Sequence, residues 1–328
     1  MLSNSREHAA KKRNVTKPGV RRCSLQTGFL RSGLTDGAGS MPTDPLTQTA
    51  DGSMAGQVAL ITGGSKGLGQ LLANALARAG ASVVITGRSL QPLEEAASSI
   101  AQAGGKVLPL VCDVSNAEAV KTAVQRAQEA VGPIDILVNN AGQAGPIDKA
   151  WRTDPTEWWQ TFEVNLYGSF LCMHAVLPKM VERERGIIIN VASQAGVHRW
   201  PNCSAYAVSK SAVIKLTENL AAETWRQGLS LFAYHPGLLP IGMKSERDDT
   251  LAPGSPAERV WSWANELVQS GKGTSPERSV AQLMKLASGR YPGLSGCYLT
   301  VHDDLDAMNA RMAGDDRRKD LYRLRLLE

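Results

Sequence analysis

Short runs of β-branched and other apolar residues alternate with longer amphipathic segments from Gly56 onward. Apolar runs of about four to eight residues bounded by turn residues are typical of buried strands, whereas apolar positions that recur every three or four residues indicate helices. We predict strands at Val58–Thr62, Ser82–Thr86, Val107–Cys112, Ile134–Asn139, Gly186–Val191, Leu229–Tyr234 and Cys297–Val301. We predict helices near residues 67–79, 90–103, 116–131, 155–181, 206–226 and 276–288.

The predicted strands are apolar along most of their length, and helical segments separate them. This pattern indicates a parallel sheet whose two faces are both covered by helices. Right-handed crossovers then give an α/β fold, a doubly wound parallel seven-stranded sheet of Rossmann type in a single domain, which we place at residues 54–304. Ligands of such sheets bind at the carboxyl ends of the strands, so we expect the chemistry just after each strand.

Three segments carry the signals of helix starts. In Asp154–Glu157 and Ser255–Glu258 a capping residue precedes a proline, and a glutamate follows at the third helical position. Proline suits the first position because its missing N–H would be unpaired there, and the glutamate can complete a capping box. The segment Ser115–Glu118 has the spacing of a third capping box, with Ser115 as the cap.

Composition and charge narrow the possible functions. The chain has 328 residues, of which 43% are hydrophobic and 20% charged, as is ordinary for a globular protein. No run approaches the roughly 18 apolar residues of a membrane span, so we expect no membrane partner. The net charge is +5, and basic residues such as Lys11, Lys12 and Arg13 gather near the N-terminus. The rest is therefore close to neutral, which argues against nucleic-acid binding.

The five cysteines are widely scattered and show no CxxC or Cys/His ligand spacing. This pattern indicates reduced thiols and a cytoplasmic location, and it predicts no metal site.

Residues 1–53 lack sustained apolar periodicity and are rich in Ser, Thr, Gly, Pro and basic residues. We expect this N-terminal extension to be disordered. It could be a targeting peptide, a regulatory tail, or upstream sequence from a start codon assigned too early, since Met54 directly precedes the first strand.

A glycine-rich turn follows the first predicted strand and precedes a helix. Its TGxxxGxG spacing lets the backbone turn tightly and approach a pyrophosphate at the positive end of the helix. A plain tight turn is the alternative, but the position between a strand and a helix favours cofactor binding. We predict that these residues bind the cofactor: Thr62, Gly63, Ser65, Lys66, Gly67, Leu68 and Gly69.

The end of the second strand indicates which nicotinamide cofactor is used. An NAD enzyme normally places an acid there for the ribose 2′-hydroxyl, whereas this strand ends at Arg88. An arginine can bind a 2′-phosphate through two hydrogen bonds, and Lys66 adds a second positive charge. We therefore predict NADP as the cofactor; the alternative is that Arg88 and Lys66 are ordinary surface charges.

Ser193 follows the fifth predicted strand, and Tyr206 and Lys210 come 13 and 17 residues later. Tyrosine and lysine at positions i and i+4 lie on one face of a helix. A tyrosine of ordinary pKa, about 10, is a poor base at neutral pH, but a nearby ammonium group favours the phenolate and lowers that pKa. The three residues together indicate acid/base chemistry on a substrate oxygen.

With these motifs in order, the sequence resembles the short-chain dehydrogenase/reductase family, in its single-domain NADP-preferring branch. The resemblance covers roughly residues 56–302. The motifs that carry it are the glycine loop, Cys112–Val114, Asn139–Gly142, Asn165, Ser193, the Tyr206 and Lys210 pair, and Pro236–Gly237.

The resemblance implies a catalytic set of four residues. Tyr206 would exchange a proton with the substrate oxygen. Lys210 would hold the nicotinamide ribose and lower the pKa of Tyr206. Ser193 would stabilise charge on the substrate oxygen, and Asn165 would anchor a water that passes protons to bulk solvent.

The resemblance also assigns cofactor contacts beyond the glycine loop. Asp113 and Val114 would flank the adenine, and Asn140 would hold the turn that faces the ribose. Pro236 and Gly237 belong to the cofactor site, together with Tyr206 and Lys210.

One position departs from the family pattern. Many relatives have a threonine that holds the nicotinamide carboxamide where this chain has Ile241. Backbone groups would then hold the nicotinamide carboxamide in place of the threonine.

We expect substrate contacts from three segments that flank the site, Gln143–Trp151, Gln194–Cys203 and residues 238–272. The last contains a capped helix with Trp261 and Trp263, and it has the position of a lid that closes over substrate. A purely structural insertion is the alternative.

Several conspicuous residues receive structural interpretations. We interpret His235 as a structural or pocket-wall residue, and Cys203 as a possible pocket residue rather than a nucleophile. Trp158, Trp159 and Phe162 have the spacing of core or subunit packing.

The C-terminal tail, residues 305–328, has a helix-like leucine spacing at Leu321, Leu324 and Leu327. It either packs on a neighbouring subunit or is a solvated tail.

The sequence thus predicts an NADP(H)-dependent oxidoreductase that interconverts a secondary alcohol and a ketone. Two alternatives remain, a reductase of an activated carbon–carbon double bond and a non-catalytic NADP-sensing module. The family resemblance further implies a homodimer or homotetramer that acts on a small-molecule substrate.

Overall fold

A computed structural model of the chain describes residues 53–242, 251–314 and 322–323. All of them belong to one compact unit, Pro42–Glu328. Our predictions for residues 1–52 and for the leucines at 321, 324 and 327 lie outside the described residues. None of the described helices combines the length and the apolar character that crossing a membrane requires.

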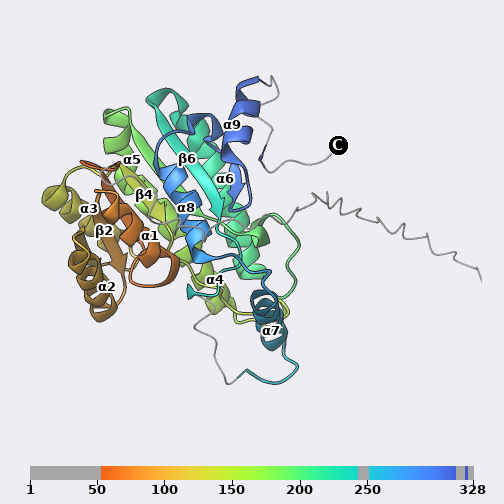
Figure 1. Ribbon diagram of the computed structural model, residues 1–328. Coiled ribbons are helices and arrows are strands. Elements are labelled where there is room, and N and C mark those ends of the chain that lie inside the picture. The colour runs from red at the N-terminus through yellow and green to blue at the C-terminus, as the bar shows by residue number, and fades with distance from the viewer. Residues whose placement is uncertain (1–52, 243–250, 315–321, 324–328) are drawn as a thin grey trace, which may run out of the picture. The chain divides into compact units, whose positions relative to one another are not determined.

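Seven parallel strands form one sheet in the order β3-β2-β1-β4-β5-β6-β7 (Figure 1). The strands are β1 (Val58–Thr62), β2 (Ser82–Gly87), β3 (Lys106–Val111), β4 (Ile136–Asn139), β5 (Gly186–Val191), β6 (Leu229–His235) and β7 (Tyr298–Thr300). The order reverses between β1 and β4, which makes this the switch point where such sheets bind ligands. The predicted doubly wound, seven-stranded sheet is confirmed.

Helices cover both faces of the sheet, as the apolar strands required. The described helices are α1 (Gly67–Arg78), α2 (Leu90–Gln102), α3 (Ala117–Val131), α4 (Pro155–Phe162), α5 (Gly168–Glu182), α6 (Ser204–Thr224), α7 (Pro256–Gln269), α8 (Pro276–Ala287) and α9 (Leu305–Gly314). Helices α1, α2, α8 and α9 contribute to one buried cluster, and α3, α5 and α6 contribute to the other.

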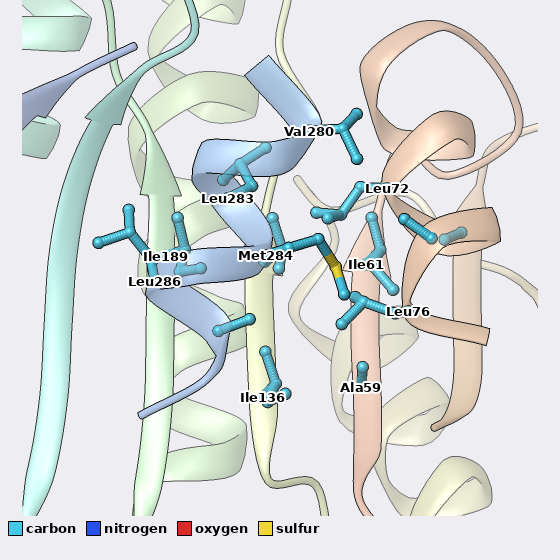
Figure 2. Close-up of a cluster of buried hydrophobic side chains, with 14 of the residues drawn as sticks. Ala59, Ile61, Leu72, Leu76, Ile136, Ile189, Val280, Leu283, Met284 and Leu286 are labelled. Carbon is cyan, nitrogen blue, oxygen red and sulfur yellow. The ribbon is translucent and has the colours of Figure 1, made fainter. Parts of the chain in front are cut away.

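The alternation of side chains along β1 explains why the two clusters are separate. Ala59 and Ile61 pack in the cluster of α1 and α8, whereas Val58 and Leu60 pack in the opposite one. Successive side chains of a strand point to opposite faces, so a strand buried on both sides is apolar throughout. Figure 2 shows Met284 of α8 directed between the strands and helix α1.

The segment 155–181, which we predicted as one helix, is divided. A π-helical turn, Glu163–Tyr167, separates α4 from α5. Such turns insert one extra residue per turn and are frequent at functional sites. The insertion changes which side chains face the sheet, and it places Asn165 in the buried interior.

Two of the three predicted helix caps are confirmed and one is shifted. The Asp154 carboxylate accepts hydrogen bonds from the N–H groups of Thr156 and Glu157, and the Ser255 hydroxyl accepts one from Glu258. At α3 the cap is Asn116, not Ser115. The Ser115 hydroxyl donates to Asp113 instead, at 2.7 Å, so it is not free to cap the helix.

Candidate active site

The glycine loop connects β1 to α1 at the switch point of the sheet. Gly63 and Gly67 have φ angles of +63° and +57°, a region that side chains disfavour. A Cβ on Gly69 would lie 2.4 Å from the Gly63 carbonyl oxygen, so this position admits only glycine. The loop is therefore compact and closed against the start of α1.

Thr62 and Asn140 hold this loop against the end of β4. The Thr62 hydroxyl accepts hydrogen bonds from the N–H groups of Asn140 and Ala141, both at 3.0 Å. The Asn140 amide donates to the carbonyls of Thr62 and Gly63, at 2.9 and 3.1 Å. Thr62 is buried and thus fixes the shape of the loop through these bonds.

The residues predicted to lie near the adenine are found at the ends of β2 and β3. Arg88 is exposed just beyond β2, and Ser65 lies beside Gly87. Burial raises the pKa of the Asp113 carboxyl, but hydrogen bonds from Ser115 and the charge of Arg88 outweigh it and hold the pKa below its usual range. Arg88 and Asp113 are thus close enough to interact, while Val114 is buried in the core.

Ser193, Tyr206 and Lys210 meet beyond the end of β5. Tyr206 and Lys210 are one turn apart on α6, and the Ser193 side chain is near enough to the Tyr206 hydroxyl to oppose the rise in its pKa. The Lys210 side chain is 4% exposed, and its Nζ donates to the Val191 carbonyl at 2.7 Å. Its Nζ also lies 5.8 Å from the centre of the Tyr206 ring.

Burial controls the pKa values of this pair. It lowers the pKa of Lys210 to about 8, because the charged form loses its hydration. Burial also raises the pKa of Tyr206, although the hydrogen bond from Ser193 opposes this change. We predicted a lowered tyrosine pKa in the presence of Lys210; the direction is opposite in this structure, because burial outweighs the other effects.

Asn165 is fully buried in the π-helical turn, where its side chain bonds to two segments. Its amide accepts from the Gln143 N–H at 2.9 Å and donates to the Gln143 carbonyl at 3.0 Å. It also donates to the Ser209 hydroxyl on α6, at 3.0 Å. Asn165 therefore ties the segment after β4 to the helix that carries Tyr206 and Lys210.

The segment after β6 turns sharply at Gly237, whose φ angle is +84°. A Cβ there would lie 2.0 Å from the Thr274 hydroxyl oxygen, so Thr274 packs directly against this glycine. Thr274 is buried, and its N–H donates to the Leu238 carbonyl at 2.8 Å. This contact was not predictable from the sequence, since Thr274 is 37 positions away from Gly237.

One cavity of about 640 Å³ joins most of the predicted site. The predicted site residues that line it are Gly63, Lys66, Gly67, Leu68, Asn140, Ser193, Tyr206, Lys210, Pro236 and Gly237. The remaining predicted site residues, all of them described, lie outside its lining: Thr62, Ser65, Gly69, Arg88, Asp113, Val114 and Asn165.

The three segments expected to contact substrate all contribute to the cavity wall. Ala144, Cys203 and Trp261 are examples from each. Strand β7 also lines the cavity through Tyr298, its first residue, and His302 follows its end; sequence reasoning missed both. Looking beyond every strand end would have included His302, whereas Tyr298 lies within β7 and reaches the cavity because β7 pairs with β6.

The aromatic residues of α4 have mixed environments. The Trp158 indole donates to the Ser204 hydroxyl at 3.0 Å and stacks on Phe162. Trp159 is 58% exposed, so it is not a core residue of the described chain.

Comparison with known proteins identifies a family and several relatives of this chain. The family model described as short chain dehydrogenase matches residues 57–252. A short chain dehydrogenase of Pseudocercospora fijiensis is 41% identical over 57% of this chain and 60% of its own length. The short chain dehydrogenase pigC of Monascus ruber is 33% identical over 82% of this chain and 86% of its own length.

Solved structures share the fold and the sequence pattern. A variant of actinorhodin polyketide ketoreductase, solved with NADPH, is 26% identical with a TM-score of 0.68, over 76% of this chain and 97% of that one. Levodione reductase is 29% identical with a TM-score of 0.69, over 80% of this chain and 99% of that one. The glycine loop, the Ser193, Tyr206 and Lys210 group and these matches show that the chain belongs to the short-chain dehydrogenase/reductase family.

Proposed function

We propose that this protein is an NADP(H)-dependent oxidoreductase that interconverts a secondary alcohol and a ketone. The observation that carries the proposal is the convergence of Ser193, Tyr206 and Lys210 on the cavity that the glycine loop also lines. An acid/base group beside a nucleotide-binding loop is the arrangement that hydride transfer to a carbonyl requires.

The residues around the cavity fit a dinucleotide. Gly63 and Gly67 allow close approach of a pyrophosphate to the loop backbone and to the N-terminus of α1. A Cβ on Gly142 would lie 3.6 Å from the Lys210 Nζ, so the bare glycine leaves this buried cation open to ribose hydroxyls. Pro236 and Gly237 would hold the nicotinamide end.

Two features favour NADP over NAD. The end of β2 carries Arg88, an exposed cation, and Lys66 is exposed in the neighbouring glycine loop. Both could pair with a 2′-phosphate. The actinorhodin polyketide ketoreductase relative was solved with NADPH, which supports the same assignment.

The protein residues would handle the proton while the bound cofactor supplies or accepts the hydride. In reduction, Tyr206 donates its phenolic proton to the substrate oxygen, and its raised pKa keeps it protonated at neutral pH. Ser193 donates a hydrogen bond to the same oxygen and stabilises the developing negative charge. Lys210, with a pKa of about 8, is mostly cationic at pH 7 and stabilises the phenolate that remains.

The proposal also includes the path by which Tyr206 regains a proton after reduction. Asn165 is committed through its side chain to Gln143 and Ser209. It would therefore act by fixing the backbone around the Lys210 ammonium, where a water could bridge to solvent. Oxidation of the alcohol would run these steps in reverse.

The proposal includes a homodimeric or homotetrameric assembly and a cytoplasmic location. Trp159, Tyr167 and Phe170 are exposed on α4, the π-helical turn and α5, and the rings of Tyr167 and Phe170 lie 6.5 Å apart. An exposed aromatic surface on these helices supports a homodimer or homotetramer. Cys112, Cys172 and Cys203 are buried thiols that form no disulfide, which supports a cytoplasmic enzyme.

The proposal is tested by incubating the enzyme and NADPH with a panel of ketones, quinones and β-keto compounds. The oxidation of NADPH is measured through the loss of its absorbance. We expect turnover of at least one ketone, faster with NADPH than with NADH. Binding of NADPH without turnover of any panel compound would favour the sensing module. Turnover of activated alkenes alone would favour the double-bond reductase.

A further inference from the structure

Two polar atoms of the cavity wall are buried without a hydrogen-bond partner among the described residues. They are the His235 Nδ1 and the Tyr298 hydroxyl oxygen. Both side chains line the cavity that contains Ser193 and Tyr206. Buried polar groups in native proteins almost always have partners, and leaving one unpaired costs about 1–3 kcal/mol. These two atoms therefore point to a partner that enters the cavity.

The two side chains lie on one face of the sheet, beside the reacting centre. His235 pairs with Thr300 and Ala233 pairs with Tyr298 in the parallel register of β6 and β7. Residues two apart on a strand share a face, so His235 and Tyr298 are diagonal neighbours. Tyr298 packs against the buried cluster of Ala192, Ile214 and Ala233, and Tyr206 is near enough to affect its pKa.

Both groups are uncharged at neutral pH. Burial, together with the charges of His302 and His198, lowers the pKa of His235 to about 4. Burial also raises the pKa of Tyr298. A neutral imidazole and a phenol each donate and accept one hydrogen bond, which suits a hydroxyl or carbonyl oxygen. A carboxylate or phosphate would need a cation to offset its desolvation here.

A metal ion does not explain the three histidines near this end of the cavity. Within the described part of the chain, no group of three or more His, Cys, Asp or Glu side chains could hold a metal ion. His198, His235 and His302 all line the cavity.

Three tryptophans also line the cavity, among aliphatic residues. Trp200, Trp261 and Trp263 line it, and the rings of Trp200 and Trp263 meet edge to face with their centres 5.3 Å apart. Trp261 and Trp263 come from α7, so this helix closes the cavity against the Gln194–Cys203 segment. Flat, apolar ligands bury well between such rings.

We propose that His235 and Tyr298 form a subsite for a second, neutral oxygen of the substrate, distinct from the carbonyl at Tyr206. The substrate is then an aromatic or polycyclic ketone that bears a hydroxyl or a further carbonyl group. This inference rests on the proposed function, because it takes Tyr206 as the position of the reacting carbonyl.

The experiment compares 1-tetralone with its 5-, 6-, 7- and 8-hydroxy derivatives in the full-length enzyme with NADPH. We expect kcat/KM to be higher for at least one hydroxy isomer than for 1-tetralone. The selectivity ratio is kcat/KM for that hydroxy isomer divided by kcat/KM for 1-tetralone. In the Tyr298→Phe variant this ratio should fall by roughly 10-fold, because one hydrogen bond to a buried partner is lost. His235→Leu should lower the same ratio, and His235→Asn, which keeps a polar group near Nδ1, should restore part of it.

Tyr234→Phe is the matched control, since Tyr234 neighbours His235 but bonds to Ser279 on the opposite face of the sheet. Its selectivity ratio should equal that of the wild type. A wild-type enzyme that reduces the tetralones without preferring any hydroxy isomer would overturn the subsite. So would equal loss of kcat/KM for all tetralones in Tyr298→Phe.

A wild-type enzyme that turns over no ketone would count against the proposed function instead. The subsite is then tested by binding, with tryptophan fluorescence titrated by the same tetralones. Tighter binding of a hydroxy isomer that Tyr298→Phe abolishes would support the subsite, whereas equal affinities in both proteins would overturn it.

Discussion

Replacing Lys210 with methionine should change how the stability of the protein depends on pH. Lys210 is 4% exposed, and the only hydrogen bond described for its ammonium group is to the Val191 carbonyl. Methionine has a similar length and no charge, so the variant keeps the packing and removes the titration. The effect on stability can therefore be worked out from the pKa of one group.

The sign follows from the direction of the shift. Burial lowers the pKa of Lys210 from 10.5 to about 8 in the folded protein. Between these values the unfolded chain is protonated and the folded one is neutral, so unfolding takes up a proton and becomes harder as the pH rises. The shift corresponds to roughly 3 kcal/mol at 1.36 kcal/mol per pKa unit. Below about pH 8 Lys210 is protonated in both the folded and the unfolded protein, so it no longer makes the stability depend on pH.

Urea unfolding of wild type and Lys210→Met, followed by circular dichroism between about pH 7 and pH 10.5, measures this effect. We expect the free energy of unfolding of the wild type to rise relative to the variant by roughly 3 kcal/mol over this range. The control is Lys215→Met, because Lys215 is exposed on the same helix. If the free energy of unfolding changed with pH in the same way for wild type and Lys210→Met, burial would not lower the pKa of Lys210 as described.

Three further substitutions test other parts of the site. Arg88→Asp should weaken NADPH relative to NADH in kcat/KM, since a carboxylate repels a 2′-phosphate; an unchanged preference removes Arg88 from the cofactor site. Gly69→Ala should weaken NADPH binding measured by calorimetry, because its Cβ would meet the Gly63 carbonyl; wild-type affinity would contradict this. Asn165→Ala should lower the free energy of unfolding by about 2–4 kcal/mol, because it leaves the Gln143 N–H and carbonyl unpaired and removes one hydrogen bond of Ser209; a loss below 1 kcal/mol would argue against this.

The sheet was predictable because its strands are buried on both faces. Each strand is apolar at consecutive positions, as in Ile187–Ile189, and glycines and helix caps mark the connections. The predicted strand ends agree with the structure within about two residues. The division of the segment 155–181 was not predictable, because a π-helical turn keeps a nearly helical apolar pattern and adds one residue.

The site was predictable where short motifs carry the chemistry and not where distant segments meet. Ser193, Tyr206 and Lys210 lie within 18 residues of one another, so their grouping can be recognised in the sequence. Thr274 and Tyr298 reach the cavity only through the pairing of β6 with β7 and the return of the chain after α7. The direction of the Tyr206 pKa was missed for a similar reason, since burial depends on the packing of the whole cavity.

The most direct test of the central claim replaces Tyr206 with phenylalanine, which removes only the hydroxyl group. NADPH binding, measured by calorimetry, should stay within a few-fold of wild type, because the phenyl ring keeps its place on α6. The rate of ketone reduction should fall by about 10²–10⁴-fold, the usual contribution of a positioned acid/base group. A variant that binds NADPH and reduces the ketone at the wild-type rate would contradict the role of Tyr206 as the proton donor.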